Sequence, residues 1–279
     1  MPGELKTPVV VTPDWLRANL GGVVAADARW YSDGRSGLSA YGARHIEGAI
    51  FVDLDGCLSG VPSVEAGRHP LPDAARFAEE MSRLGVADDD IVVAYDDAGG
   101  IYEARLVWML RATGHGAAIL DGGLAGWTGP MDSVTPQRSR ASFTPVPWPC
   151  ELLASIEEVA SGSRMLVDAR NGERYRGDGE DPLDPRAGHI PGAVSIPCRE
   201  NLQPSGEFLP VDLLRQRFAD AGVSDAGELI AYCGSGVTAC HDLLAFEWAG
   251  LGRGRLFVGS WSQWSNDRRR PIATGADPG

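Results

Sequence analysis

Short apolar runs alternate with amphipathic stretches along the whole chain. In the first half, the apolar runs predict buried strands over Val23–Ala26, Ile91–Tyr95 and Ala118–Leu120, and the amphipathic stretches predict helices over Pro72–Leu84 and Tyr102–Thr113. In the second half, the predicted strands are Met165–Val167, Leu229–Tyr232 and Leu256–Val258, and the predicted helices are Val211–Ala221 and Thr238–Ala249. This alternation is typical of βαβ units. It predicts an α/β fold with mainly parallel sheets and helices on both faces.

Four short motifs occur twice, in the same order and at a nearly constant offset. The pairs are Asp27-Ala28-Arg29 with Asp168-Ala169-Arg170, His45–Ala49 with His189–Ala193, Ala94-Tyr95 with Ala231-Tyr232, and Gly122 with Gly259. Such repetition indicates two homologous domains. Five prolines between Thr128 and Pro149 favour an extended connector. We therefore predict domains over 1–128 and 150–279, joined by a linker over 129–149.

Composition narrows the class of protein. The chain has 279 residues, enough for two cores, and a net charge of −13. So acidic a balance is atypical of a general nucleic-acid binder, and no apolar run is long enough to span a membrane. We therefore expect neither nucleic acid nor membrane as a partner. The five cysteines form no paired motif. This spacing favours a cytoplasmic location over a disulfide framework, and we expect neither a metal nor another cofactor.

One loop has the features of a nucleophilic site. Cys233 follows the predicted strand Leu229–Tyr232 and begins a run whose other members are Gly234, Ser235, Gly236, Val237 and Thr238. The two glycines allow a tight curl with inward backbone amides, and Thr238 can cap the following helix. A cysteine there faces several N–H dipoles, which favour the thiolate that attacks sulfur. A buried, inert cysteine is the alternative.

These residues carry a family resemblance. The loop Cys233–His241, the twin DAR and HIxGA motifs and the duplication resemble the tandem-domain rhodaneses, and among them the mercaptopyruvate-using sulfurtransferases. The resemblance implies a persulfide on Cys233, with no cofactor. It also implies that the first domain is silent, because Asp96 stands where the second domain has Cys233. Thiosulfate-using members have basic residues at the positions of Gly234 and Ser235, so 3-mercaptopyruvate is the expected donor.

The resemblance also implies the residues that bind the donor. The family holds the carboxylate and keto oxygen of mercaptopyruvate with two arginines, the first of which matches Arg174. Pro182 stands at the place of the second, so Arg186 is the expected substitute and Arg176 the fallback. A guanidinium suits this task because its fork binds a carboxylate through two parallel hydrogen bonds. A solvated or structural charge is the alternative for each arginine.

A Ser-His-Asp group follows from the same resemblance. Ser235, His69 and Asp55 match its three members, with His69 and Asp55 contributed by the first domain. The active site is accordingly expected in the cleft between the domains. Such a group can relay a proton to departing pyruvate or remove one from Cys233. The matched His45 and His189 occur in both domains, which indicates a structural role. Where the family usually has aspartate and glutamate, this chain has Val258 and Gln263.

Other functions fit less well or stay open. A phosphatase loop needs arginine six residues after the cysteine, where Ala239 stands. Thiosulfate:cyanide sulfurtransfer remains an alternative, as does a persulfide carrier that delivers sulfur to a partner protein. The expected acceptor is cyanide or a thiol, such as thioredoxin or a sulfur-delivery protein. Cys240, near Cys233 in sequence, is expected to pack or face solvent rather than to react.

Overall fold

The computed structural model describes residues 7–181 and 183–279, so Lys6 and Pro182 lie outside the described residues. The described chain divides into two compact units. Unit 1 comprises residues 7–60, Pro72–Pro149 and Leu202–Phe208. Unit 2 comprises the described parts of Val61–Leu71, Cys150–Asn201 and Leu209–Gly279. The segment Val61–Leu71 therefore packs with the second half of the chain. The domain limits expected from the sequence stay a prediction.

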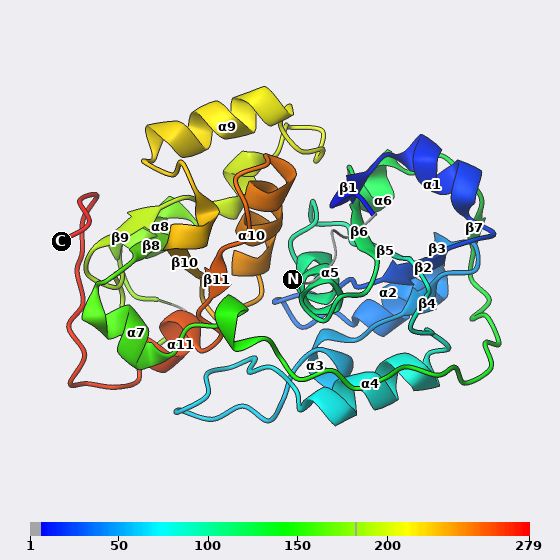
Figure 1. The fold of residues 1–279 in the computed structure, drawn as a ribbon, viewed down its shortest axis with the longest axis horizontal. Helices are drawn as coiled ribbons and strands as arrows, with labels where there is room; N and C mark the ends of the chain where they lie inside the picture. The colour runs from blue at the N-terminus through cyan, green and yellow to red at the C-terminus, as the bar shows by residue number, and fades with distance from the viewer. Residues whose placement is uncertain (1–6, 182) are drawn as a thin grey trace. The chain divides into compact units, whose positions relative to one another are not determined.

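Unit 1 is built on a parallel sheet (Figure 1). Its strand order is β1 (Val10–Val11), β6 (Ala117–Leu120), β5 (Val92–Tyr95), β2 (Val24–Asp27) and β4 (Ile50–Phe51). Its helices are α1 (Pro13–Asn19), α2 (Gly37–Ala43), α3 (Leu54–Cys57), α4 (Ala74–Arg83), α5 (Glu103–Ala112) and α6 (Gly123–Gly126). Helix α5 packs on β5 and β6. Part of the predicted linker forms β7 (Met131–Asp132), antiparallel to β3 (His45–Ile46).

Unit 2 repeats the plan with four parallel strands. The order is β11 (Arg255–Leu256), β10 (Leu229–Tyr232), β8 (Met165–Asp168) and β9 (Ala193–Ser195). Its helices are α7 (Ile156–Ser161), α8 (Gly172–Arg176), α9 (Val211–Asp220), α10 (Ala239–Trp248) and α11 (Ser260–Trp264), with 3₁₀ turns at Cys150–Leu152, Cys198–Asn201 and Ala226–Glu228. The α/β class and the parallel sheets are confirmed. Strand β11 ends two residues before the predicted end at Val258.

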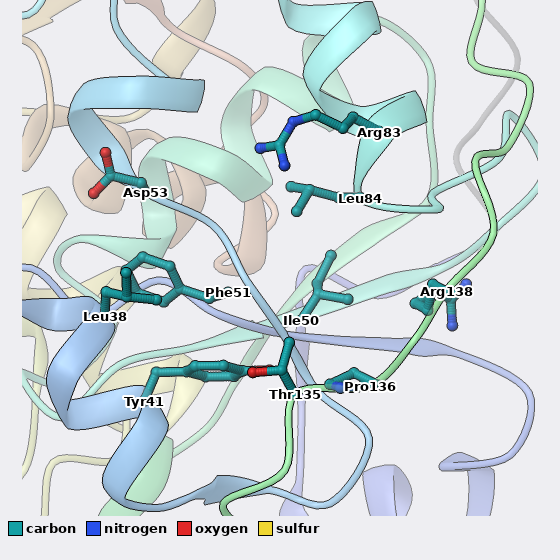
Figure 2. A pocket seen from close by; sticks show the side chains of 10 residues that line it. All are labelled: Leu38, Tyr41, Ile50, Phe51, Asp53, Arg83, Leu84, Thr135, Pro136 and Arg138. Atoms are coloured by element: carbon teal, nitrogen blue, oxygen red, sulfur yellow. The ribbon is translucent and has the colours of Figure 1, made fainter.

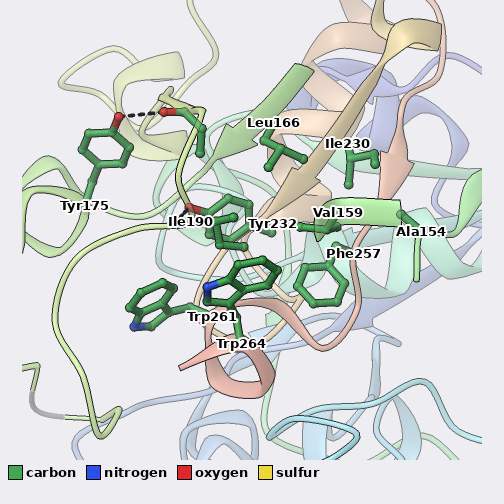
Figure 3. Close-up of a cluster of buried hydrophobic side chains, with 11 residues drawn as sticks. Ala154, Val159, Leu166, Tyr175, Ile190, Ile230, Tyr232, Phe257, Trp261 and Trp264 are labelled. Carbon is green, nitrogen blue, oxygen red and sulfur yellow. Dashed lines mark hydrogen bonds between the residues drawn. The ribbon is translucent and has the colours of Figure 1, made fainter. Parts of the chain in front are cut away.

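The core of unit 2 contains two tryptophans from α11 (Figure 3). Trp261 and Trp264 are 0% and 2% exposed and pack with residues from the sheet, such as Tyr232 and Leu166. Each indole N–H donates to a main-chain carbonyl, of Arg186 at 3.0 Å and of Pro271 at 2.8 Å. A buried indole needs such a partner for its polar edge. The two tryptophans thereby anchor the short helix α11 against residues of the sheet.

Each unit has the same buried polar group at the end of its central strands. Arg29 Nη2 lies 2.6 Å from Asp27 Oδ2, and Arg170 Nη2 lies 2.6 Å from Asp168 Oδ2. The matched histidines hydrogen-bond through Nδ1 to main-chain carbonyls, His45 to Tyr41 at 2.7 Å and His189 to Tyr175 at 2.8 Å. Because a carbonyl only accepts, each Nδ1 carries the proton. Their predicted structural role is confirmed.

A tyrosine at the end of a central strand in each unit completes this buried polar group. The hydroxyl of Tyr95 accepts the N–H of Ile46 at 3.0 Å, and that of Tyr232 accepts the N–H of Ile190 at 3.1 Å. Both tyrosines are fully buried. The duplication visible in the sequence therefore reproduces individual hydrogen bonds.

Among the described residues, no helix combines the length and the apolar character needed to cross a bilayer.

The paired tyrosines allow a stability test. Tyr95→Phe should reduce the free energy of unfolding by about 1–3 kcal/mol, because it leaves the buried N–H of Ile46 without its acceptor. Tyr232→Phe should cost a similar amount through Ile190. Urea denaturation measures both. Wild-type stability in both variants would contradict the assignment of these bonds.

Candidate functional site

Cys233 begins a tight loop directly after β10, at the carboxyl end of the parallel sheet of unit 2. Its side chain is 1% exposed, and its Sγ accepts the backbone N–H of Gly236 at 3.1 Å. Gly236 has φ +76°, and a Cβ atom there would lie 2.5 Å from the carbonyl oxygen of Val258. Only glycine meets both constraints without displacing the main chain. The curl that aims an amide at the sulfur therefore depends on Gly236.

The start of α11 clamps the main chain of this loop. The N–H groups of Trp261 and Ser262 donate to the carbonyls of Cys233 at 3.0 Å and Gly234 at 2.9 Å. The hydroxyl of Ser260 accepts the N–H of Cys233 at 3.2 Å and donates to the carbonyl of Phe257 at 2.9 Å. Ser260 has φ +52°, the only non-glycine residue with positive φ among those the structure describes. Backbone strain of this kind costs about 1–3 kcal/mol and persists where surrounding contacts require it.

The helix that follows begins differently from the prediction. Thr238 stands at the N-cap position of α10, but its φ of −71° and ψ of −19° are helical and its side chain makes no capping hydrogen bond. A side-chain cap requires an extended residue whose oxygen folds back over the first turn. Instead, the N–H of Cys240 donates to Val237 and that of His241 to Thr238, at 3.1 Å each. The predicted cap is therefore wrong.

The segment Val61–Leu71 brings His69 to the loop. Nδ1 of half-buried His69 lies 2.8 Å from the Ser235 hydroxyl. The segment is fixed by α11, because the hydroxyl of Ser262 accepts the N–H of Arg68 at 3.1 Å. Two predicted members of the Ser-His-Asp group are thus hydrogen-bonded. The third, Asp55, lies in α3 of unit 1 and accepts the indole N–H of Trp30 at 3.1 Å. Its predicted contact with His69 joins residues of different units and stays a prediction.

Two arginines lie over Gly234, the residue after the cysteine. A Cβ atom at position 234 would lie 3.1 Å from Arg68 Nη2 and 3.3 Å from Arg174 Nη1. Both guanidiniums bind the buried carboxylate of Asp184: Arg68 through Nη1, and Arg174 through Nη2 at 3.0 Å. Arg174 also binds Asp181, with Nη2 2.9 Å from Oδ2. The sequence predicted a position near the donor for Arg174 and made no prediction for Arg68, although its place next to His69 was an available signal.

Arg186 has a different environment from the one expected of a donor-binding residue. Its guanidinium donates to four main-chain carbonyls, those of Trp264, Ser265, Asp267 and Arg270, at 2.7–3.1 Å. Nε, Nη1 and Nη2 are all engaged in holding this turn. These bonds are evidence against the predicted role and assign Arg186 to the structure of the turn. The fallback, Arg176, pairs with Asp178 at 2.7 Å and is 43% exposed.

Two hollows lie outside the cysteine loop, and neither is lined by a residue of that loop. One, of about 580 Å³, is lined only by unit 1 residues (Figure 2): Leu38, Tyr41, Ile50, Phe51, Asp53, Arg83, Leu84, Thr135, Pro136 and Arg138. It contains none of the predicted site residues. The other, of about 230 Å³, touches Arg174, but its walls carry four carboxylates, from Glu173, Asp178, Glu180 and Asp181. So acidic a lining disfavours an anionic ligand on that side of Arg174.

Comparison with known proteins identifies the family. The model of the rhodanese-like domain matches residues 12–130 and again 151–267. The chain belongs to the rhodanese-like domain family.

Similar proteins cover almost the whole chain. The probable 3-mercaptopyruvate sulfurtransferase of Pseudomonas aeruginosa is 43% identical over 85% of this chain and 88% of its own length. The putative thiosulfate sulfurtransferase SseB of Mycobacterium tuberculosis is 37% identical over 92% and 95%. The structure of 3-mercaptopyruvate sulfurtransferase from Leishmania major superposes with a TM-score of 0.85 at 29% identity, covering 98% of this chain and 78% of that one.

The two rhodanese-like units differ at the first residue of this loop. In unit 1 the loop after β5 begins with Asp96, whose Oδ1 accepts the N–H groups of Ala98 at 2.7 Å and Gly100 at 3.0 Å. Its Oδ2 accepts the N–H of Tyr102 at 2.9 Å. The carboxylate thus occupies its own curl of amides. This arrangement supports the expectation that the first rhodanese-like domain is silent.

One departure from the family pattern has a structural explanation. Gln263 stands where the resemblance implies glutamate, and its Nε2 donates to the carbonyl of Glu65. A glutamate could not donate this bond when ionised. The glutamine therefore helps to hold the segment that carries His69 against α11.

The requirement for glycine in the cysteine loop can be measured against a second position. Gly236→Ala should lower the free energy of unfolding by at least about 2 kcal/mol, because both positive φ and a main-chain clash oppose a side chain. Gly162, with φ +62° and open space around it, isolates the first effect. Gly162→Ala should cost only about 1 kcal/mol. Equal losses in urea denaturation would contradict the clash with Val258.

Proposed function

We propose that this protein is a sulfurtransferase that takes sulfane sulfur from 3-mercaptopyruvate onto Cys233 and passes it to a thiol or to cyanide. The observation that supports it most directly is the Cys233 sulfur, which accepts the backbone N–H of Gly236, in the same loop as Ser235, which is hydrogen-bonded to His69. Membership of the rhodanese-like family and the activities for which the relatives are named support the same reaction class.

Among the thiols, Cys233 is best placed to react. Burial raises the pKa of Cys57 to about 11, and burial, with nearby Asp242, raises the pKa of Cys198 well above its ordinary value. Those thiols stay protonated near neutral pH and are poor nucleophiles. Cys240 is fully buried and donates through Sγ to the carbonyl of Gly236 at 3.4 Å. Cys150 is exposed, but no loop of inward amides surrounds it in the part of the chain that the structure describes.

The first half-reaction transfers one sulfur atom without net oxidation. The Cys233 thiolate attacks the sulfur of mercaptopyruvate, forming an S–S bond while the C–S bond breaks. The electron pair of that C–S bond leaves on pyruvate as its enolate, which takes up a proton. The substrate's sulfur remains on Cys233 as a persulfide. In the second half-reaction an acceptor thiolate or cyanide attacks this outer sulfur and releases the Cys233 thiolate.

Ser235 and His69 supply the proton in this scheme. When Nδ1 of His69 donates to the Ser235 hydroxyl, the hydroxyl proton is directed away from the ring and toward the leaving enolate. Asp55 is the proposed third member, which orients His69. Backbone amides of Gly236, Val237 and Thr238 are the proposed contacts of the outer sulfur. These roles rest on the geometry of the loop together with the family pattern.

The donor follows from the charges near the nucleophile. Gly234 and Ser235 place no cation within the loop, whereas Arg174 approaches Gly234 from outside it. A donor whose carboxylate lies at some distance from its reacting sulfur fits this arrangement better than a compact sulfonate. The proposal further includes transfer of the sulfur atom to thioredoxin or to a sulfur-delivery protein in the cytoplasm. All five cysteines are unpaired thiols, as a reducing compartment requires.

Intact mass tests the nucleophile and the donor together. After brief exposure to 3-mercaptopyruvate, the wild type should gain one sulfur atom, and Cys233→Ser should gain none. Cys240→Ser and Cys198→Ser should retain most of the loading. Thiosulfate should load the wild type far more slowly. Equal or faster loading by thiosulfate would favour the alternative donor, and loss in Cys240→Ser would require a second thiol.

The proton relay has its own signature. His69→Ala should lower kcat with 3-mercaptopyruvate by roughly 10²–10⁴-fold, the usual contribution of general acid–base catalysis. Ser235→Ala should have a smaller effect if water replaces the hydroxyl, and the double variant should be strongly non-additive. Melting temperature on the same preparations separates catalysis from packing. A lower melting temperature with unchanged kcat would remove His69 from the mechanism.

A further inference from the structure

Two guanidinium nitrogens beside the cysteine loop have unused hydrogen-bonding capacity. Arg68 Nη1 binds Asp184 and the carbonyl of Leu183, and Arg174 uses Nε and Nη2 for Asp181 and Asp184. Arg68 Nε and Nη2 and Arg174 Nη1 have no hydrogen-bond partner within residues 7–181 and 183–279. Of these, Arg68 Nη2 and Arg174 Nη1 face the Cβ position of Gly234, at 3.1 and 3.3 Å. Two of the donors that remain available thus converge on one point next to Cys233.

Asp184 holds the two arginines in this arrangement. Its side chain is 1% exposed and takes Arg68 on Oδ1 and Arg174 on Oδ2, while the arginine side chains are 31% and 23% exposed. Asp184 accepts hydrogen bonds from both guanidiniums and Asp181 accepts further bonds from Arg174, and these shared bonds fix the direction of both forks. Arg68 is further fixed through its main chain by Ser262. The pair is therefore preorganised rather than assembled around a ligand.

The chemistry at this point is that of a carboxylate receptor. Two N–H groups from different guanidiniums match the two oxygens of one carboxylate, each through a charge-assisted hydrogen bond. Gly234 leaves room for the ligand, since any side chain there would meet both nitrogens. The hollow that touches Arg174 is lined by carboxylates and disfavours an anion. The space beside Gly234 is thus the better place for an acidic donor near Arg174.

We infer that Arg68, from the segment that precedes His69, is the second arginine that binds the donor's carboxylate, together with Arg174. Asp184 positions both. This inference rests on the proposed function and specifies which residues recognise the donor. It moves the second guanidinium from the segment Asp181–Arg186, where the sequence placed it, to a segment far away in the chain. Arg68 then binds the carboxylate of the donor, and His69, at the adjacent position, takes part in proton transfer.

Discrimination between an acid and its ester tests the inference. We would measure kcat and KM of the full chain with 3-mercaptopyruvate and with its methyl ester. Arg68→Met should raise KM for the acid about 10- to 100-fold, the value of one charge-assisted hydrogen bond, with kcat changed far less. The ester, which lacks the charge, should react equally in wild type and variant. Arg68→Lys keeps an ion pair for Asp184 but lacks the second nitrogen, so its KM for the acid should stay raised.

Matched controls separate this role from a structural one. Arg269→Met removes an arginine that is 90% exposed, and should leave both substrates unaffected. Equal losses for acid and ester in Arg68→Met and Arg68→Lys, or an Arg68→Met enzyme indistinguishable from Arg269→Met, would overturn the inference while the proposed function stands. If the wild type produces no pyruvate and gains no sulfur, the proposed function fails instead. In that case, calorimetry of pyruvate binding tests whether Arg68 binds a carboxylate. Weaker binding to Arg68→Met than to the wild type supports a carboxylate site, and unchanged binding overturns it.

Discussion

Backbone amides that curl together at the end of a buried strand need an electron-rich partner, and each unit provides a different one. In unit 1 the Asp96 carboxylate accepts three amides of its own loop. In unit 2 the corresponding position holds the Cys233 sulfur, which accepts the N–H of Gly236. A carboxylate can satisfy the loop but cannot accept a sulfur atom. A cysteine sulfur can do both, which is why we propose that one duplicated loop yields a silent and a reactive copy.

The short helix α11 fixes the main chain of the cysteine loop in unit 2. Its first three residues bond the main chain of Cys233 and Gly234, and Ser262 also bonds the segment that carries Arg68 and His69. The strained backbone of Ser260 belongs to this clamp. In unit 1 the matching residue is Gly123, with the same φ of +52°. Glycine adopts that conformation without strain, so the serine is present only where its hydroxyl holds the main chain of Cys233.

The charge of the whole chain does not favour an acidic ligand, whereas guanidinium N–H groups beside the cysteine loop do. The chain carries a net charge of −13, which would repel an acidic donor at long range. Near Gly234, two guanidiniums share the carboxylate of Asp184, and their available N–H groups face the loop. Short-range hydrogen bonds in a partly buried site are screened far less than surface charges. In the proposed reaction, recognition of the donor therefore depends on these few residues and not on the overall field.

The sequence by itself determined the duplication, the α/β class, most strands and helices, and the asymmetry between Asp96 and Cys233. These properties are encoded locally, because periodicity and short motifs reflect burial and turns over a few neighbouring residues. Only the tertiary structure decided that Val61–Leu71 packs with unit 2, that Arg68 faces Gly234, and that Arg186 is occupied by four carbonyls. The physical reason is that a segment without regular structure leaves no periodic pattern, and a guanidinium's partner is set by the chain segments folded around it. Whether an arginine binds a carbonyl, an aspartate or a ligand is thus decided by long-range packing.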